Sequence, residues 1–462
     1  MAAPHFLVVT FIGQGHLNPS RALAARIARA TGARVTLSVA VSMHRRMFPS
    51  LAAADEEVDD GGPISYFPYS DGYDDGFRFV GGGGGDQLDY AHRSARVGRA
   101  TLAAVLDRLA ARGRPVTCVV YTILLWWAGE LARERGVPGV LFWAQPATVL
   151  ALYHHYFHDE YYRRLVAEHA GDPGFVVAVP GLPPMAIGDL PVLLTDSTGD
   201  TMLAAALYRI RKTMEQVDID MSNGGGKAMV LVNTVEALEA GGALTCIPGL
   251  EVLPIGPLFD AGHGAETYME WLDTKPARSV VYVSFGSIST MSKRQQEEMR
   301  RGLASSGRPY LCVVRDDHDG GGDELLASSA GLVVGWCDQA RVLSHAAVGC
   351  FVTHCGWNST LEAVASGVPV VAVPQCFEQH ANARILVAEW GVGVRAAVAD
   401  DGVLEAEELN RCLEMVMGDN EAAVAVRRSS AAWKAKVTEA TAEGGSSDRN
   451  FKTFLNKTVK RP

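Results

Sequence analysis

Two successive series of short apolar runs, separated by turns and amphipathic segments, constrain this chain more than any other feature. Near-continuous runs of Val, Leu and Ile between helical segments are typical of parallel strands covered on both faces by helices. The pattern therefore predicts an α/β protein with two doubly wound domains. The expected strands are 6–11, 34–40, 64–67, 117–121 and 139–143 in the first series, and 279–285, 309–314, 331–335, 348–353, 368–373 and 391–396 in the second.

A stretch rich in Pro and Gly separates the two series. Residues 246–264 read CIPGLEVLPIGPLFDAGHG, a composition typical of a domain boundary. We therefore expect an N-terminal domain over 1–245, a linker over 246–264 and a C-terminal domain over 265–440. The last segment, 441–462, is expected to form a helix that packs back on the N-terminal domain.

Composition excludes several functional classes. A net charge of −10 argues against a nucleic-acid-binding protein, which needs a basic surface for phosphates. No apolar stretch reaches the roughly 20 residues that a membrane span needs, and the start, MAAPHFLVVTF, resembles a first strand rather than a signal peptide. Eight cysteines without a paired pattern indicate reduced thiols, so we expect a soluble, cytoplasmic protein.

The motif VGCFVTHCGWNSTLEAVASGVPVV joins a predicted strand to a helix. His354, Asn358 and Ser359 would lie at the start of that helix, where free N–H groups and partial positive charge suit a phosphate. Glu362 follows one turn later, and its carboxylate could accept hydrogen bonds from both hydroxyls of a ribose. The alternative is that Asn358 or Ser359 only caps the helix and that Trp357 packs in the core.

Two neighbouring strand ends carry complementary side chains. Trp336 follows the run 331–335, and Glu378 and Gln379 follow the run 368–373. The carboxyl ends of parallel strands meet at one edge of the sheet, where ligands bind in open α/β folds. An aromatic face, an anion site and a carboxylate–amide pair would together suit a base, a diphosphate and a sugar.

On these residues, the stretch 336–379 resembles the donor-binding signature of plant UDP-dependent glycosyltransferases, family 1. The tryptophan, the HCGWNS block, the glutamate and the closing acid–Gln pair are all in register. The resemblance covers nearly the whole chain, including GQGHLNP and SVVYVSFGS, and FWAQPATVLALYHHYFH is most similar to the branch with anthocyanin 5-O-glucosyltransferases. It implies a GT-B fold of two facing Rossmann-like domains and hexosyl transfer to small plant secondary metabolites such as flavonoids.

The resemblance also implies a UDP-glucose site without a metal ion. Trp336 would stack on uracil, the Cys337 backbone would read the base edge, and Glu362 would hold the ribose. In this family, Gln at the closing position goes with glucose. The implied donor-binding residues are Ser287, Trp336, Cys337, Gln339, His354, Trp357, Asn358, Ser359, Glu362, Glu378 and Gln379, of which Ser287, His354, Asn358 and Ser359 bind the diphosphate and Trp357, Glu378 and Gln379 the sugar.

His16, in the first loop, is the general base that the resemblance implies, although a lone loop histidine is more often structural. It would take the proton of the acceptor as its oxygen attacks the anomeric carbon, giving a β-glucoside with inversion. Many relatives support this histidine with an aspartate where this chain has Thr122. A threonine can fix a tautomer but cannot stabilise imidazolium, so His16 should be a weak base. We therefore expect an acidic acceptor, either a phenol or flavonoid hydroxyl or a carboxylic acid.

Aromatic stretches after two strands are candidates for the acceptor pocket, with Trp126, Trp143 and Gln145 as the named residues. Core packing is the competing explanation for each of them. Alternatives within the same fold are a glucose-ester-forming enzyme for plant-hormone-like acids and an enzyme that uses another UDP-sugar. A non-catalytic nucleotide-sugar binder would lose His16, and a nicotinamide oxidoreductase would show a full GxGxxG, which this chain lacks.

Three histidines near residue 155 are spaced as zinc ligands could be. His154, His155 and His158 have no evident carboxylate or cysteine partner in the sequence, so no metal site is predicted. The expected partners are a UDP-sugar and a small acceptor, with the protein acting as a monomer.

Overall fold

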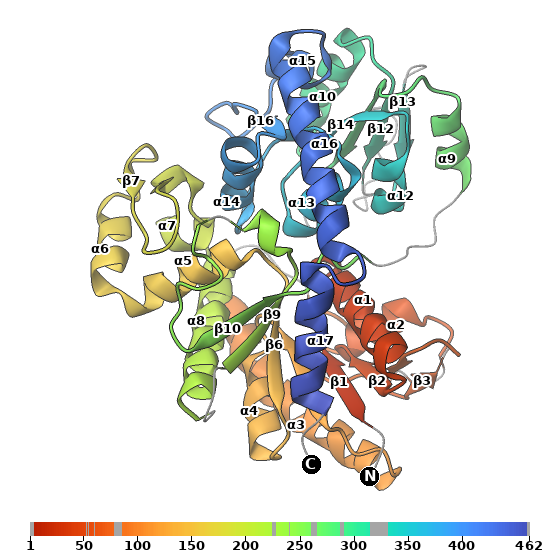
Figure 1. The fold of residues 1–462 in the computed structure, drawn as a ribbon, viewed down its shortest axis with the longest axis vertical. Coiled ribbons are helices and arrows are strands. Elements are labelled where there is room, and N and C mark those ends of the chain that lie inside the picture. The colour runs from red at the N-terminus through yellow and green to blue at the C-terminus, as the bar shows by residue number, and fades with distance from the viewer. Residues whose placement is uncertain are drawn as a thin grey trace. The chain divides into compact units, whose positions relative to one another are not determined.

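A computed structural model of the protein divides into two compact units, shown in Figure 1. One unit contains Met1–Ile187, Leu193–Asp260 and Thr441–Pro462, and the other contains Gly188–Val192 and Ala261–Ala440. The structure describes residues 4–51, 53, 55–59, 61–77, 86–223, 228–239, 241–259, 266–286, 291–314 and 331–459.

The first unit is built on an eight-stranded sheet in the order β10-β9-β6-β5-β1-β2-β4-β3, parallel except for the β3–β4 pair. The order reverses between β1 and β5, which are neighbours, so the crevice at their carboxyl ends is a topological switch point. The strands are β1 (His5–Val9), β2 (Arg34–Ser38), β3 (Val58–Asp59), β4 (Ser65–Tyr66), β5 (Cys118–Thr122), β6 (Gly139–Trp143), β9 (Ala228–Val232) and β10 (Leu250–Pro254).

Helices cover this sheet because its central strands are apolar on both faces; every residue of β1 and β5 is buried. An additional two-stranded antiparallel sheet pairs β7 (Val176–Val177) with β8 (Met185–Ala186). The helices are α1 (Gln14–Thr31), α2 (Val41–Met47), α3 (Asp86–Ala111), α4 (Trp126–Glu134), α5 (Ala147–His158), α6 (Glu160–Glu168), α7 (Val192–Thr195), α8 (Thr201–Asn223) and α17 (Ser446–Val459), with short 3₁₀ turns η1 (Ile187–Asp189) and η2 (Glu236–Leu238).

The C-terminal helix α17 belongs to the first unit and packs on its sheet (Figure 1). Its Phe454 is fully buried, with the ring centroid 6.0 Å from that of Phe6 in β1. The guanidinium of Arg26, in α1, lies 4.1 Å from the ring centroid of Phe451. These contacts anchor the end of the chain on the unit that contains its beginning.

The second unit has a six-stranded, fully parallel sheet in the order β13-β12-β11-β14-β15-β16. Its switch point lies between β11 and β14. Its strands are β11 (Val280–Ser284), β12 (Tyr310–Val313), β13 (Gly331–Val334), β14 (Val348–Thr353), β15 (Val370–Ala372) and β16 (Gly393–Arg395). Its helices are α9 (Glu266–Asp273), α10 (Lys293–Ser305), α12 (Gln339–Ser344), α13 (Trp357–Ser366), α14 (Gln379–Arg384), the π-helix η3 (Ile385–Glu389), α15 (Ala406–Met417) and α16 (Glu421–Thr441).

Each apolar run predicted as a strand contains one, and the predicted doubly wound α/β class is confirmed. Three strands of the first sheet, β3, β9 and β10, were missed. Residues 250–254 fall within the range predicted as a linker but form β10, which pairs in parallel with β9. Helix α1 also starts earlier than expected, at Gln14, so the predicted first loop is largely helical. Among the described residues, no helix is long and apolar enough to cross a membrane.

Candidate active site

A tight turn after β14 aims the start of α13 at the switch point of the second sheet. Cys355 adopts a left-handed backbone with φ 64°, and its carbonyl accepts a 2.9 Å hydrogen bond from Nδ2 of the fully buried Asn382. Gly356 is the N-cap, and no side chain caps the helix. Asn358 and Ser359 therefore lie in the first turn rather than at the cap. The capping alternative for these two residues is wrong.

The ring of His354 is held between two glycines. A Cβ built on Gly286 would lie 2.6 Å from the ring atoms Cε1 and Nε2 of His354, and one on Gly356 would lie 2.5 Å from Nε2. Burial lowers the pKa of His354 to about 4, while the Ser284 backbone acts in the opposite direction. His354 is therefore neutral near pH 7 and can offer one N–H donor to an anion. Ser287, next in the chain after Gly286, lies outside the described residues.

Gln339 connects two of the predicted donor-binding residues. Its Nε2 donates to Oε2 of Glu362 at 2.6 Å and to Oγ of Ser359 at 2.8 Å. Its Oε1 accepts a 3.1 Å hydrogen bond from the hydroxyl of Tyr282, which lies 3.3 Å from Sγ of Cys337. Gln339 thus positions Glu362 from inside the unit. Tyr282 was missed because in the sequence it is one more apolar residue of a central strand.

Two glutamates of the predicted donor site have raised pKa values. Burial raises the pKa of Glu362 to about 7, with Gln339 acting against it and Asp338 adding to it. Burial also raises the pKa of Glu378 to about 7, opposed by hydrogen bonds from its own backbone and from Asn382. Carboxyl groups balanced between charge states near neutral pH are typical of functional sites.

Trp336 presents its ring at the end of β13. Its relative exposure is 47%, which is unusual for so large an aromatic residue and leaves a face open for stacking. Cys337, by contrast, is buried. Two hydrogen bonds stabilise the turn between β13 and α12. The Tyr268 hydroxyl accepts the Asp338 N–H at 3.0 Å, and the Asp338 carboxylate caps α12 by accepting the Arg341 N–H.

The closing residues Glu378 and Gln379 are both buried at the start of α14. Oε1 of Gln379 accepts hydrogen bonds from the backbone N–H groups of Gln375 and Cys376, at 2.9 and 3.0 Å. Its Nε2 points to Sγ of Cys376 at 3.4 Å. Gln379 therefore stabilises its own loop, and its carbonyl oxygen is already committed there.

Trp357 is placed differently from the prediction. Its side chain is buried, with the ring centroid 6.2 Å from that of Trp390, which in turn lies 5.7 Å from Trp433. The side chain is part of the core, so the predicted contact between this side chain and the sugar is not supported. The backbone N–H of Trp357, in the first turn of α13, is the group that faces the end of the strand.

In the first unit, His16 lies in the first turn of α1, directly after β1. Gly13, with φ 112°, is the N-cap that allows the sharp change of direction. The ring of His16 stands edge-on to Phe11, with centroids 5.5 Å apart. Within the described part of the chain, Nδ1 of His16 is buried and has no hydrogen-bond partner. Burial alone lowers the pKa of His16 to about 4.

Thr122 does not support His16 as predicted. Its Oγ1 accepts the backbone N–H of Phe11 at 3.0 Å, which joins the ends of β1 and β5 across the switch point. The predicted role of Thr122 in fixing the tautomer of His16 is therefore wrong: its position is structural. In the part of the chain that the structure describes, no carboxylate shifts the pKa of His16, which stays a neutral imidazole.

Two of the three predicted acceptor residues lie in the core. Trp143 is fully buried and its Nε1 donates to the Pro146 carbonyl at 3.1 Å. Trp126 is also buried and stands edge-on to Tyr208, with centroids 5.8 Å apart. Gln145 is half-buried. For the two tryptophans the competing explanation, core packing, agrees with the structure.

A small cavity beside Phe11 contains a buried cation that the sequence did not reveal. Arg209, in α8, is 4% exposed and donates to Oγ of Ser94 at 2.7 Å. Its guanidinium lies 5.3 Å from the ring centroid of Phe11 and 5.1 Å from that of Tyr90. The cavity is lined by Phe11, Ile12, Tyr69, Asp71, Tyr90, Ser94, Leu125, Trp127 and Arg209.

Arg209 forms no ion pair within 4 Å among the described residues, which is unusual for a buried guanidinium. Asp71 lines the same cavity and is buried, and burial raises its pKa, with Arg209 acting against that rise. The Phe11 ring thus contacts both Arg209 and His16. The cavity places a positive charge one aromatic ring away from the candidate base.

Comparison with known proteins identifies the family of this chain. The family described as UDP-glucoronosyl and UDP-glucosyl transferase matches residues 259–437. Crocetin glucosyltransferase, chloroplastic, of Gardenia jasminoides is 40% identical over 98% of this chain and 96% of its own length. Anthocyanidin 3-O-glucoside 5-O-glucosyltransferase 1 of Perilla frutescens is 38% identical, with both chains fully covered.

Among solved structures, Os79 of O. sativa, in complex with U2F and trichothecene, superposes with a TM-score of 0.82 at 30% identity. The match covers 98% of this chain and 100% of Os79. The predicted GT-B fold is thereby confirmed, and so is the resemblance to the plant enzymes. The chain belongs to the family of plant UDP-dependent glycosyltransferases and is a glycosyltransferase.

Proposed function

We propose that the protein transfers glucose from UDP-glucose, with inversion, to an acidic oxygen of a small acceptor, and that His16 is the general base. The product is a β-glucoside of a phenol or flavonoid, or a β-glucose ester of a carboxylic acid. The names of the relatives, which are glucosyltransferases, favour glucose as the sugar. The proposal is supported by the general rule that ligands of open α/β sheets bind at the switch points, of which each of the two sheets has one.

The observation that carries the proposal is the environment of His16. Its side chain is half-buried with Nδ1 fully buried, its lowered pKa of about 4 keeps it neutral at pH 7, and Nδ1 has no partner in the described part of the chain. A neutral histidine can accept a proton from an incoming hydroxyl. With a pKa of about 4, and with no carboxylate among the described residues to stabilise imidazolium, it is a poor base for an alkyl alcohol. A phenol is easier to deprotonate, and a carboxylic acid is already ionised.

We propose further that Arg209 contributes to the binding of an acidic acceptor. A carboxylate or phenolate that enters beside Phe11 would meet a buried guanidinium that, among the described residues, donates a hydrogen bond to Ser94. A guanidinium has five N–H donors in a fork that matches a carboxylate. We infer that Arg209 attracts and orients the anionic group of the acceptor.

In the second unit, Trp336 would stack on the base and Glu362, positioned by Gln339, would hold the ribose. The N-terminus of α13 and the N–H of His354 would stabilise the departing diphosphate. Glu378 would accept hydrogen bonds from the sugar. The proposed reaction needs no metal ion, because these groups and the helix dipole supply the leaving-group stabilisation.

We further propose a cytoplasmic location. All eight cysteines are free, and most of them are buried in the cores of the two units. Free thiols are typical of a reducing compartment.

The test is a comparison of wild type and His16→Ala with UDP-glucose and an aromatic carboxylic acid or a phenol. Proton NMR of the product should show the β-anomeric coupling, and His16→Ala should lose at least about a hundredfold in kcat with a phenol. UDP binding by calorimetry should be unchanged, because His16 lies outside the proposed donor site. An α-anomer, or full activity of His16→Ala with phenols, would refute the assignment.

A further inference from the structure

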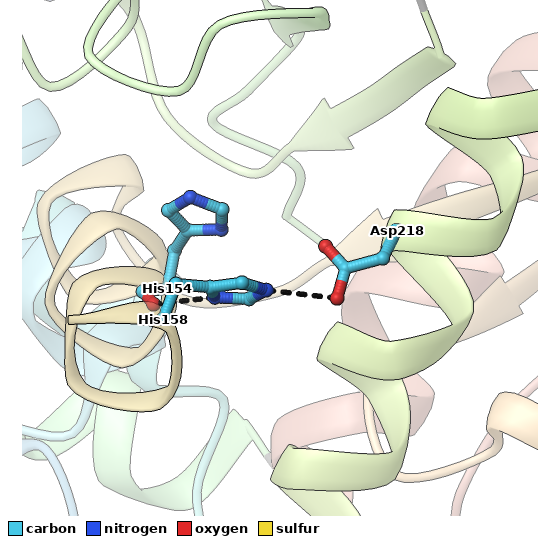
Figure 2. Close-up of side chains that lie close together, drawn as sticks. All are labelled: His154, His158 and Asp218. Carbon is cyan, nitrogen blue, oxygen red and sulfur yellow. Dashed lines mark hydrogen bonds and ion pairs between the residues drawn. The ribbon is translucent and has the colours of Figure 1, made fainter. Parts of the chain in front are cut away.

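A side-chain cluster that shares no residue with either candidate site has the composition of a transition-metal site. His154 and His158 lie one turn apart on α5, and Asp218 comes from the neighbouring helix α8 (Figure 2). One ligand atom from each of the three lies within 4.8 Å of the others. The sequence revealed only the histidines, because Asp218 is 60 residues away and reaches them only through the packing of α5 against α8.

His158 is oriented as a metal ligand would be. Its Nδ1 faces the backbone carbonyl of His154 at 2.7 Å, and its Nε2 faces Oδ2 of Asp218 at 2.8 Å (Figure 2). A neutral imidazole has one N–H, so it can donate to only one of these two acceptors. If Nδ1–H donates to the carbonyl, Nε2 and the carboxylate share a proton or a cation. Metal-bound histidines are commonly fixed through their other nitrogen in this way.

His154 supplies a second nitrogen at the same place. Its ring stacks on that of His158, with centroids 4.2 Å apart and planes 21° apart. No hydrogen bond of either ring nitrogen to another described residue is present, so a lone pair is available. Two histidines at positions i and i+4 share one helix face, which lets them converge on one ion.

The helix end adds to this arrangement. His158 is the last residue of α5, and the C-terminus of a helix carries partial negative charge that favours a cation. Two ligands of a tetrahedral zinc ion lie about 3.3 Å apart when each bond is about 2.0–2.1 Å. On binding, Nε2 of His158 and Oδ2 of Asp218, now 2.8 Å apart, would separate slightly, and the His154 ring would rotate towards them. The three side chains are half-exposed or exposed and can make these movements.

We propose that His154, His158 and Asp218 bind a divalent transition-metal ion, with Zn²⁺ as the natural choice for two imidazoles and one carboxylate, and a water as the fourth ligand. The ion ties the end of α5 to α8. It takes no part in glycosyl transfer and is independent of the function proposed above.

The test is isothermal titration of the full-length protein with Zn²⁺ alone, together with its thermal unfolding with and without the ion. We expect one saturable site and a rise in Tm. His158→Ala and Asp218→Asn should each weaken Zn²⁺ binding by at least about tenfold, since even outer partners of a metal contribute that much. His154→Ala should do the same. Circular dichroism of each variant without zinc shows whether it is folded.

His345→Ala is the matched control. His345 forms the same kind of pair with a carboxylate, its Nε2 lying 3.0 Å from Oδ1 of Asp273. No group of three ligands includes it among the described residues. This variant should bind Zn²⁺ as wild type does. The absence of saturable binding to wild type, or binding that survives both His158→Ala and Asp218→Asn, would overturn the proposal and leave an ordinary ion pair between His158 and Asp218.

Discussion

The backbone N–H of Phe11 donates a 3.0 Å hydrogen bond to Oγ1 of Thr122, and this bond joins β1 to β5 beside the candidate base. Thr122 is fully buried and its oxygen is committed to the backbone. An aspartate at this position could accept the same N–H and still present a second carboxylate oxygen towards the crevice that contains His16.

Thr122→Asp should therefore strengthen His16 as a base. A nearby carboxylate stabilises imidazolium and raises the pKa of His16 from about 4. We expect glucosylation of alkyl alcohols to rise by at least about tenfold in kcat, with little change for carboxylic acids. Thr122→Asn is the control, since it has nearly the same shape without the charge. An equal gain in both variants would show that shape, not charge, limits the base.

Arg209→Gln should impair the use of carboxylic acid acceptors more than the use of neutral phenols. Loss of a charge-assisted hydrogen bond costs about 1.5–3 kcal/mol, so KM for carboxylic acid acceptors should rise about tenfold or more. Phenols that are neutral at the assay pH should be affected less. Ser94→Ala removes a hydrogen-bond partner of Arg209 but keeps the cation, so this variant should retain the preference for carboxylic acid acceptors over neutral phenols. A uniform loss for all acceptors in Arg209→Gln would indicate a structural role only.

Gly286→Ala should damage the donor site through His354. The new Cβ would lie 2.6 Å from the His354 ring, and the backbone at Gly286 is left-handed with φ 78°. Such crowding costs about 1–3 kcal/mol, so KM for UDP-glucose should rise about tenfold. Gly402→Ala is a control for the backbone strain, because Gly402 has the same φ and nothing within 4 Å of its Cβ. Similar kinetics for the two variants would contradict the role of His354.

The pH dependence should follow the glutamates rather than the histidine. Loss of solvation raises the pKa values of Glu362 and Glu378 to about 7, and both carboxyl groups accept hydroxyl hydrogen bonds best when ionised. With an acceptor ionised throughout, kcat/KM for UDP-glucose should fall as pH drops below 7. His16, with a pKa of about 4, stays unprotonated over this range. In Glu362→Gln the fall of kcat/KM with decreasing pH should be about half as steep. An unchanged pH profile would show that Glu362 is not one of the groups whose ionisation causes the fall.

The donor site could be predicted from the sequence because its parts are contiguous. One turn and one helix start carry His354, Asn358, Ser359 and Glu362, so the strand–helix pattern alone brings them together. The sequence left open whether the Trp357 side chain packs in the core, because helix periodicity does not tell which residues of a first turn face inward, and the structure buries it. Trp390 packs against it from a different element.

Features that depend on packing between distant segments could not be predicted. Arg209 lies on an amphipathic helix, where a charged residue suggests a solvated face, yet α8 buries it against Phe11 and Tyr90. Asp218 meets His158 only because α8 lies beside α5. Residues 250–254 form β10 although Pro and Gly flank them, because a parallel partner, β9, is available.

The measurement that tests the central claim most directly is a competition experiment followed by mass spectrometry. Purified protein is incubated with UDP-glucose and an equimolar mixture of an aromatic carboxylic acid, a phenol and an alkyl alcohol. The masses of the products are then measured before and after treatment with mild alkali. We predict hexose adducts on the acid, lost in alkali, or on the phenol, stable in alkali, with the alcohol slower by at least about a hundredfold. Comparable rates for the alcohol and the phenol would contradict the assignment of His16 as a weak base that requires an acidic acceptor.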